Sequence, residues 1–222
     1  MASERSVRLA LVLLACAAIS CATVRGGSVH AELESAVEAT DALAISDALE
    51  KLIATGADTP ADHELAYDAI RDNHVDTAPA AFARAAVTGR LVQKRGLLGA
   101  DLVDDVERSA MRSRELDPGF RDGAATRLLG TLYVIAPAIY LEHGDSERGL
   151  ELLEGLVEER PDIPENHLRL AEAYIALRDP SPAQPHLCRA LAARAALRWD
   201  DQKLLDRLVE SVGAVDCGSV DE

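Results

Sequence analysis

Aromatic residues and positive charge are both scarce in this sequence. Phe, Trp and Tyr make up only 3% of the 222 residues, so a surface that stacks on sugars or nucleic-acid bases is not expected. The formal net charge is −15, whereas nucleic-acid phosphates are bound by Lys and Arg. The same charge disfavours electrostatic adhesion to anionic lipid. The composition therefore argues against nucleic-acid partners.

Familiar catalytic and metal-binding motifs are also missing. The chain has no Gly-x-Ser-x-Gly, no phosphate-binding glycine loop and no His-Glu-x-x-His. The acidic run Asp101, Asp104, Asp105 and Glu107 lacks the spacing of a calcium loop and suits the start of a helix. Most histidines are scattered, and we expect surface or helix-cap positions for His63, His74, His143, His167 and His186. The sequence therefore predicts no enzyme activity and no cofactor.

Long hydrophobic runs are absent except near the N-terminus, from Leu9 to Ala22. The apolar part, Leu9 to Ile19, is shorter than the about 20 residues that span a bilayer. Arg5 and Arg8 precede it and small residues follow, an arrangement typical of a secretory signal peptide. A buried N-terminal helix is the alternative.

Cysteine is limited to four positions, Cys16, Cys21, Cys188 and Cys217. The segment Ala18-Ile19-Ser20-Cys21 resembles a bacterial lipobox, in which the cysteine is lipidated and becomes the first mature residue. Processing at Cys16 would leave an apolar stretch of only about seven residues. We therefore predict lipidation of Cys21; an ordinary cysteine after a conventional cleavage site is the alternative.

Processing at Cys21 has two further consequences. Loss of Glu4, Arg5 and Arg8 would change the net charge from −15 to −16. Cys188 and Cys217 would remain as an even pair in an oxidising compartment, so we predict a disulfide between them, with two free thiols as the alternative. Ala22, rather than an aspartate, follows the lipidated position and favours the periplasmic side of the outer membrane.

The rest of the chain shows the periodicity of amphipathic helices. Apolar residues recur at intervals of three and four, and turn and capping residues fall between these segments. An apolar content of 48% excludes global disorder. We predict an all-α fold of about eight or nine helices, in antiparallel pairs. The expected domains are a signal peptide (1–21), a tether (22–29), one helical domain (30–215) and a tail (216–222).

Internal repetition indicates a short solenoid of tetratricopeptide (TPR) type. The 34-residue pattern of this repeat places small residues where two helices cross closely. Residues 164–197 match it in register at Leu170, Ala171, Tyr174, Ala183, Leu187 and Ala190. A last helix near 199–212 is expected to close the array, with Trp199 covering its apolar end.

An apolar insertion interrupts the register between Val134 and Gly144. Pro137 lacks an amide hydrogen, so the helix before it should end or kink near Ala136. Apolar insertions on a solenoid often mark the binding face. Either the insertion is a longer turn with Tyr133 packed between helices, or it forms a ligand or partner surface made of Tyr133, Pro137, Ile139 and Tyr140.

The order of segments from Pro79 to Leu197 resembles the T component associated with tripartite ATP-independent periplasmic (TRAP) transporters, a family of TPR lipoproteins. The resemblance is carried by "RSRELDPGF", "GAATRLLGTLY", a following proline, "GDSERGLELLEGLVEERPD" and "NHLRLAEAYIAL". It implies a periplasmic accessory protein that associates with a solute-binding protein, in homo-oligomers with a central pore and a ligand cleft. A general envelope-assembly scaffold and a carrier of a small apolar ligand are the alternatives.

Overall fold

The computed structural model describes residues 28–218, in which all regular structure is helical. This confirms the all-α prediction. The α-helices are α1 (Ala31–Glu38), α2 (Ala42–Thr55), α3 (Pro60–Ile70), α4 (Ala78–Arg95), α5 (Val103–Leu116), α6 (Ala124–Ile135), α7 (Ser146–Glu159), α8 (Pro164–Ala176), α9 (Ala183–Ala192) and α10 (Trp199–Val212). Short 3₁₀ helices are η1 (Gly96–Leu102), η2 (Ala138–Tyr140) and η3 (Arg194–Ala196).

Local capping chemistry sets many of the helix ends. The Asp41 carboxylate accepts hydrogen bonds from the first backbone amides of α2, and the left-handed Gly56 ends that helix. Thr59 and Asp62 form a reciprocal capping box at the start of α3. Asp145 caps α7. These signals are local in sequence, because each capping side chain bonds to backbone amides only a few residues away.

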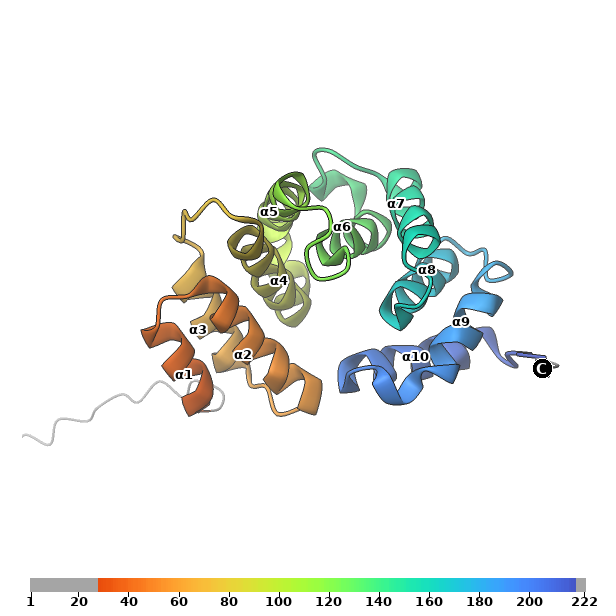
Figure 1. The fold of residues 1–222 in the computed structure, drawn as a ribbon, viewed down its shortest axis with the longest axis horizontal. Coiled ribbons are helices and arrows are strands. Elements are labelled where there is room, and N and C mark those ends of the chain that lie inside the picture. Colours follow the sequence, from red (N-terminus) through yellow and green to blue (C-terminus); the bar gives the residue numbers. More distant parts are fainter. Residues whose placement is uncertain (1–27, 219–222) are drawn as a thin grey trace, which may run out of the picture.

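Consecutive helices pack as hairpins that stack into an arc. The pairs are α4 with α5, α6 with α7, and α8 with α9, and each pair also packs on the next. Glycines allow a close crossing between α6 and α7: a Cβ atom on Gly149 would lie 2.8 Å from the carbonyl oxygen of Gly130. Figure 1 shows the resulting curvature, with α4, α6 and α8 on the inner side of the arc.

The arc closes on itself through α10. This helix packs on α8 and α9 and also contacts α2, near the other end of the described chain (Figure 1). We expected Trp199 to cover the apolar end of the array, and this is wrong. Leu204, Leu205 and Leu208 do so, whereas the Trp199 ring lies against Gly56 at the end of α2.

The insertion after α6 is held in place by a buried carboxylate. Helix α6 ends at Ile135, next to Ala136 as predicted. Glu107 of α5 accepts hydrogen bonds from the backbone amides of Glu142 and His143, both at 2.8 Å. Asp104 and Asp105 do lie in the first turn of α5, but Glu107 is fully buried. It therefore anchors the insertion instead of extending a surface acidic run.

Two histidines are placed differently from the sequence expectation. His63 and His167 are buried, whereas surface or cap positions were expected. The His63 Nε2 atom lies 2.9 Å from a carboxylate oxygen of Asp58, and the His167 Nε2 atom lies 2.7 Å from the carbonyl oxygen of Pro161. Both ring nitrogens of His167 have polar partners, since its Nδ1 atom lies 3.0 Å from the His186 Nδ1 atom. His63 has a partner only at Nε2, and its buried Nδ1 atom has none among the described residues.

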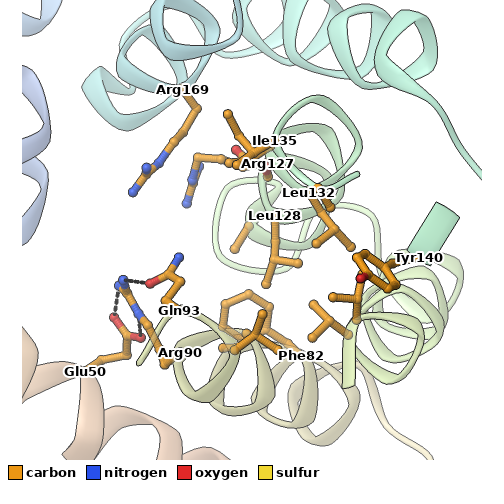
Figure 2. Close-up of a pocket in the computed structure, with 18 of the residues that line it drawn as sticks. Glu50, Phe82, Arg90, Gln93, Arg127, Leu128, Leu132, Ile135, Tyr140 and Arg169 are labelled. Atoms are coloured by element: carbon orange, nitrogen blue, oxygen red, sulfur yellow. Dashed lines mark hydrogen bonds and ion pairs between the residues drawn. The ribbon is translucent and has the colours of Figure 1, made fainter. Parts of the chain in front are cut away.

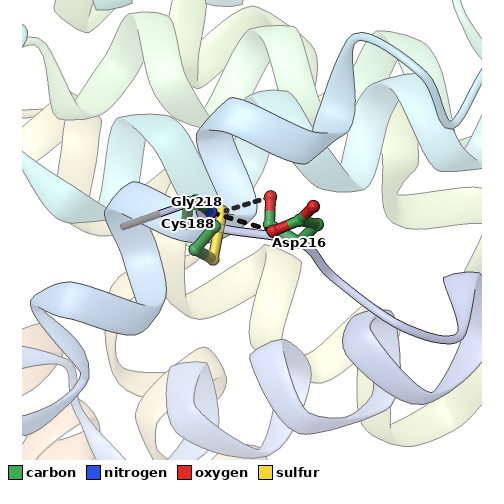
Figure 3. Close-up of a disulfide and its surroundings, with 4 residues drawn as sticks. Cys188, Asp216 and Gly218 are labelled. Atoms are coloured by element: carbon green, nitrogen blue, oxygen red, sulfur yellow. Dashed lines mark hydrogen bonds between the residues drawn. A yellow bond between two sulfur atoms is a disulfide. The ribbon is translucent and has the colours of Figure 1, made fainter. Parts of the chain in front are cut away.

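The C-terminal tail is joined to α9 by a disulfide. Cys188 and Cys217 are bonded, with 5.3 Å between their Cα atoms (Figure 3). Their pairing agrees with the pair predicted from the sequence. Cys16 and Cys21, and with them the predicted lipid site, lie outside the described residues. In the part of the chain that is described, no helix combines the length and apolar character required to cross a membrane.

Candidate functional site

A cleft of about 680 Å³ lies on the inner side of the arc. Residues of α2, α4, η1, α5, α6, α8 and α10 line it, together with the segment after α6. Small-molecule sites usually have volumes of about 300–1,000 Å³. The closure of the arc thus creates a cavity of the size that a small ligand needs.

One side of the cleft is apolar. Phe82 and Ala86 come from α4, and Leu128, Leu132 and Ile135 come from α6. Further apolar lining comes from Val103, Val106, Pro137 and Tyr140. Figure 2 shows Phe82, Leu128, Leu132 and Tyr140 together on the side away from most of the charged residues. An apolar surface of this kind takes apolar groups out of water.

Helix α6 is apolar on two faces, and this explains how it lines the cleft. Leu129 and Tyr133 belong to a buried cluster with residues of neighbouring helices. Leu128, Leu132 and Ile135 lie on a different face, because a helical residue turns by about 100° from the one before. The core cluster takes the first face and touches the second only at Leu128, so most of the second face is left to form the wall of the cavity.

The opposite side of the cleft carries a network of ion pairs. Arg90 of α4 binds Glu50 of α2 at 2.7 and 2.9 Å and Asp200 of α10 at 2.9 Å. Arg198 also pairs with Glu50. These contacts join residues up to 148 positions apart in the sequence. The network therefore holds the two ends of the arc together beside the cavity.

The electrostatics of Glu50 reflect this network. Burial alone would raise the pKa of its carboxyl group. Hydrogen bonds and positive charge from Arg90 and Arg198 outweigh burial and lower that pKa to about 2. Glu50 is therefore ionised at neutral pH and stabilises the closed arc.

Arg169 and Arg127 project into the same cavity from α8 and α6 (Figure 2). Arg169 pairs with Glu172 at 2.9 Å and with Asp201 at 2.6 Å. The Arg127 Nη1 atom donates a hydrogen bond to the Asn166 side-chain oxygen at 2.6 Å. Within residues 28–218, no carboxylate forms an ion pair with Arg127.

The residues proposed from the sequence have three different placements. Pro137 and Tyr140 line the cleft. Ile139 is exposed to solvent, at 82% of its surface, and is not part of the lining. Tyr133 is in the core, with only 5% of its surface exposed, so its assignment to a ligand or partner surface is corrected. Its ring packs against Gly144, where no side chain would fit.

Sequence reasoning missed the arginines and most of the apolar wall. The arginines are spread over three helices and the segments before α6 and α10, so no motif joins them. One usable signal was present: the segment from Ala124 to Ile135 has more apolar positions than a single buried face requires. This excess indicates a second apolar surface on the helix.

The fold and the cleft define an all-α helical-repeat protein with a concave, mainly apolar cavity. No protein-family model matches this chain, and no curated protein matches it either. Among residues 28–218, no group of three or more His, Cys, Asp or Glu side chains is arranged to hold a metal ion.

Proposed function

We propose that this protein is an exported, lipid-anchored binding protein that holds a small, mainly apolar ligand in the cleft. The observation that carries the proposal is the cavity of about 680 Å³ with an apolar wall built from α4, α5 and α6. The lipid on Cys21 would keep the binding domain at the outer membrane, on its periplasmic side. The resemblance to the TRAP-associated T component supports a place beside a transport system.

Ligand binding is tested by filling the cavity. Gly89 lies in α4 and lines the cleft, and a Cβ atom there would meet only Val106, at 3.7 Å. Gly89→Leu should therefore fold and occupy part of the ligand volume. Gly155→Leu is the matched control, because Gly155 lies in α7 with no atom near its Cβ position.

The probe is N-phenyl-1-naphthylamine, a neutral apolar fluorophore. We expect saturable binding to the full chain, weakened about tenfold or more by Gly89→Leu and unchanged by Gly155→Leu. Circular dichroism checks that both variants are helical. Equal affinities of the two variants would mean that the cleft is not the ligand site.

A second function, docking of a protein partner, is favoured by an exposed apolar rim. Leu97 and Leu98 of η1 and Ile139 of η2 have 87%, 85% and 82% of their surfaces exposed. Leu97 also lines the cleft, so the rim adjoins the mouth of the cavity. Exposed apolar patches tend to mark interaction sites. The partner proposed from the family resemblance is a periplasmic solute-binding protein.

The partner proposal is tested by co-purification from native membranes. Leu97→Asp and Ile139→Asp should release a bound solute-binding protein, whereas Val75→Asp, at another exposed apolar position, should not. If no solute-binding protein co-purifies with the wild type, the transporter assignment gives way to a general scaffold or an independent carrier. The anchor is tested separately: Cys21→Ala should abolish lipid labelling and membrane retention.

A further inference from the structure

Arg127 differs from the other arginines of the cleft in the partner of its guanidinium group. Five arginines line the cavity, and Arg90, Arg121, Arg169 and Arg198 each pair with a carboxylate. Arg127 has only the neutral side chain of Asn166 as a hydrogen-bond partner among the described residues. Its guanidinium therefore retains donors that face the cavity (Figure 2).

We propose that Arg127 is an anion subsite and that the ligand of the cleft is a monocarboxylate with an apolar chain. This inference rests on the proposed ligand-binding function and names the class of ligand. A carboxylate would supply the paired charge that Arg127 lacks, through charge-assisted hydrogen bonds.

The apolar wall continues from Arg127 along α6. Thr131 and Ile135 lie one and two turns further on, roughly above Arg127, with Leu128 and Leu132 beside them. Eight residues of helix separate Arg127 from Ile135, which corresponds to about 12 Å. A ligand with its carboxylate at Arg127 would thus place a chain of about this length along apolar side chains, ending near Pro137 and Tyr140.

Neighbouring acids favour a single negative charge on the ligand. Glu165 and Asp201 both line the same cavity. Asp201 is paired with Arg169 and Arg198, whereas Glu165 forms no ion pair among the described residues. Burial lowers the pKa of Arg127, and the negative charges of Glu165 and Asp201 oppose this effect. Glu165 would repel a second negative charge on the ligand, so a carboxylate fits this position better than a phosphate dianion.

The test compares ligands that share a chain and differ in head group. Dodecanoate, dodecanol, dodecylamine and dodecyl phosphate are titrated into the full chain by calorimetry, below their micellar concentrations. We expect dodecanoate to bind roughly 10- to 100-fold more tightly than dodecanol, the effect of hydrogen bonds to a charged group. Arg127→Gln should remove this difference and leave dodecanol binding unchanged.

One further variant tests the sign of the charge near the ligand head group, and a second variant is its control. Glu165→Gln should strengthen dodecanoate binding about two- to fivefold, because it removes a like charge near the carboxylate. Arg121→Gln is the matched control, since Arg121 also lines the cavity but is paired with Asp47 at 2.6 Å. It should leave the preference for dodecanoate over dodecanol intact.

Each contrary outcome has a distinct meaning. If Arg127→Gln binds dodecanoate as tightly as the wild type while the neutral fluorophore still enters the cleft, the anion subsite is wrong and the proposed function stands. If dodecylamine binds more tightly than dodecanoate, and Glu165→Gln weakens its binding, the ligand is a cation and the proposed negative charge is wrong. If dodecyl phosphate binds more tightly than dodecanoate, the assignment of a carboxylate head group is wrong. If neither the fluorophore nor any dodecyl ligand binds the wild type, both proposals fail.

Discussion

The crossing of α6 and α7 allows a sharp test of the packing that positions the cleft. Gly149 lies in α7 at this crossing, where a Cβ atom would be 2.8 Å from both the Gly130 carbonyl oxygen and the Tyr133 Cβ atom. Gly155 lies in the same helix and has open space around its Cβ position. Gly149→Ala and Gly155→Ala therefore make the same chemical change in one helix, with and without a close neighbour.

The expected magnitudes follow from these distances. Replacing glycine by alanine inside a helix stabilises it by roughly 0.5–1 kcal/mol. Gly155→Ala should show this gain. Gly149→Ala should instead lower the free energy of unfolding, because the backbone of α6 must move away, and overpacking of this kind costs about 1–3 kcal/mol. The helix-propensity term is common to both variants, so the difference between them measures the cost of the contact at the crossing.

The assay is urea denaturation followed by circular dichroism at 222 nm, a wavelength that reports helix content. Equal free energies of unfolding for Gly149→Ala and Gly155→Ala would refute the close crossing. A lower affinity of Gly149→Ala for the neutral fluorophore would add that the crossing also sets the shape of the cleft, since α6 forms its wall.

Two further predictions concern the closure of the arc and the tail. The pKa of Glu50 falls from 4.5 to about 2, so its ion pairs contribute up to about 3 kcal/mol above pH 4.5, lost as the pH falls through 2. Glu50→Gln should remove this contribution and its pH dependence in denaturation experiments, whereas Glu151→Gln, at an exposed pair with Arg148, should change stability by less than about 1 kcal/mol. Replacing Cys188 and Cys217 by serine should cost about 3–4 kcal/mol for a sequence separation of 29, and alkylation of unreduced protein should find neither thiol free.

The helices themselves were largely predictable from the sequence. Periodicity and capping residues depend on neighbours three or four positions away, so the ends of α6, α8 and α9 follow from local rules. The end of α6 near Ala136 followed from Pro137, and the start of α5 followed from its acidic first turn. The cysteine pair was predictable by elimination, because only two cysteines remain after residue 21.

The candidate site was predictable only in part. Pro137 and Tyr140 were identified because they interrupt a regular repeat. Tyr133 was misassigned because an aromatic residue beside an insertion can face either the core or the surface, and the nearby Gly144 that makes room for its ring is ten or more residues away in the sequence. Glu107 was predicted to belong to an acidic run at a helix start, because the sequence does not show that the backbone amides of the insertion bind its carboxylate.

The sequence by itself determined the all-α class, some of the helix ends and the place of the insertion, because these depend on short-range periodicity and backbone chemistry. Only the tertiary structure decided the contact of α10 with α2, the cavity inside the arc and the pairing of its arginines. Those features join residues such as Arg90 and Asp200, 110 positions apart. Their distance depends on the small rotation between each helix pair and the next, summed over the array, and no local pattern in the sequence records that sum.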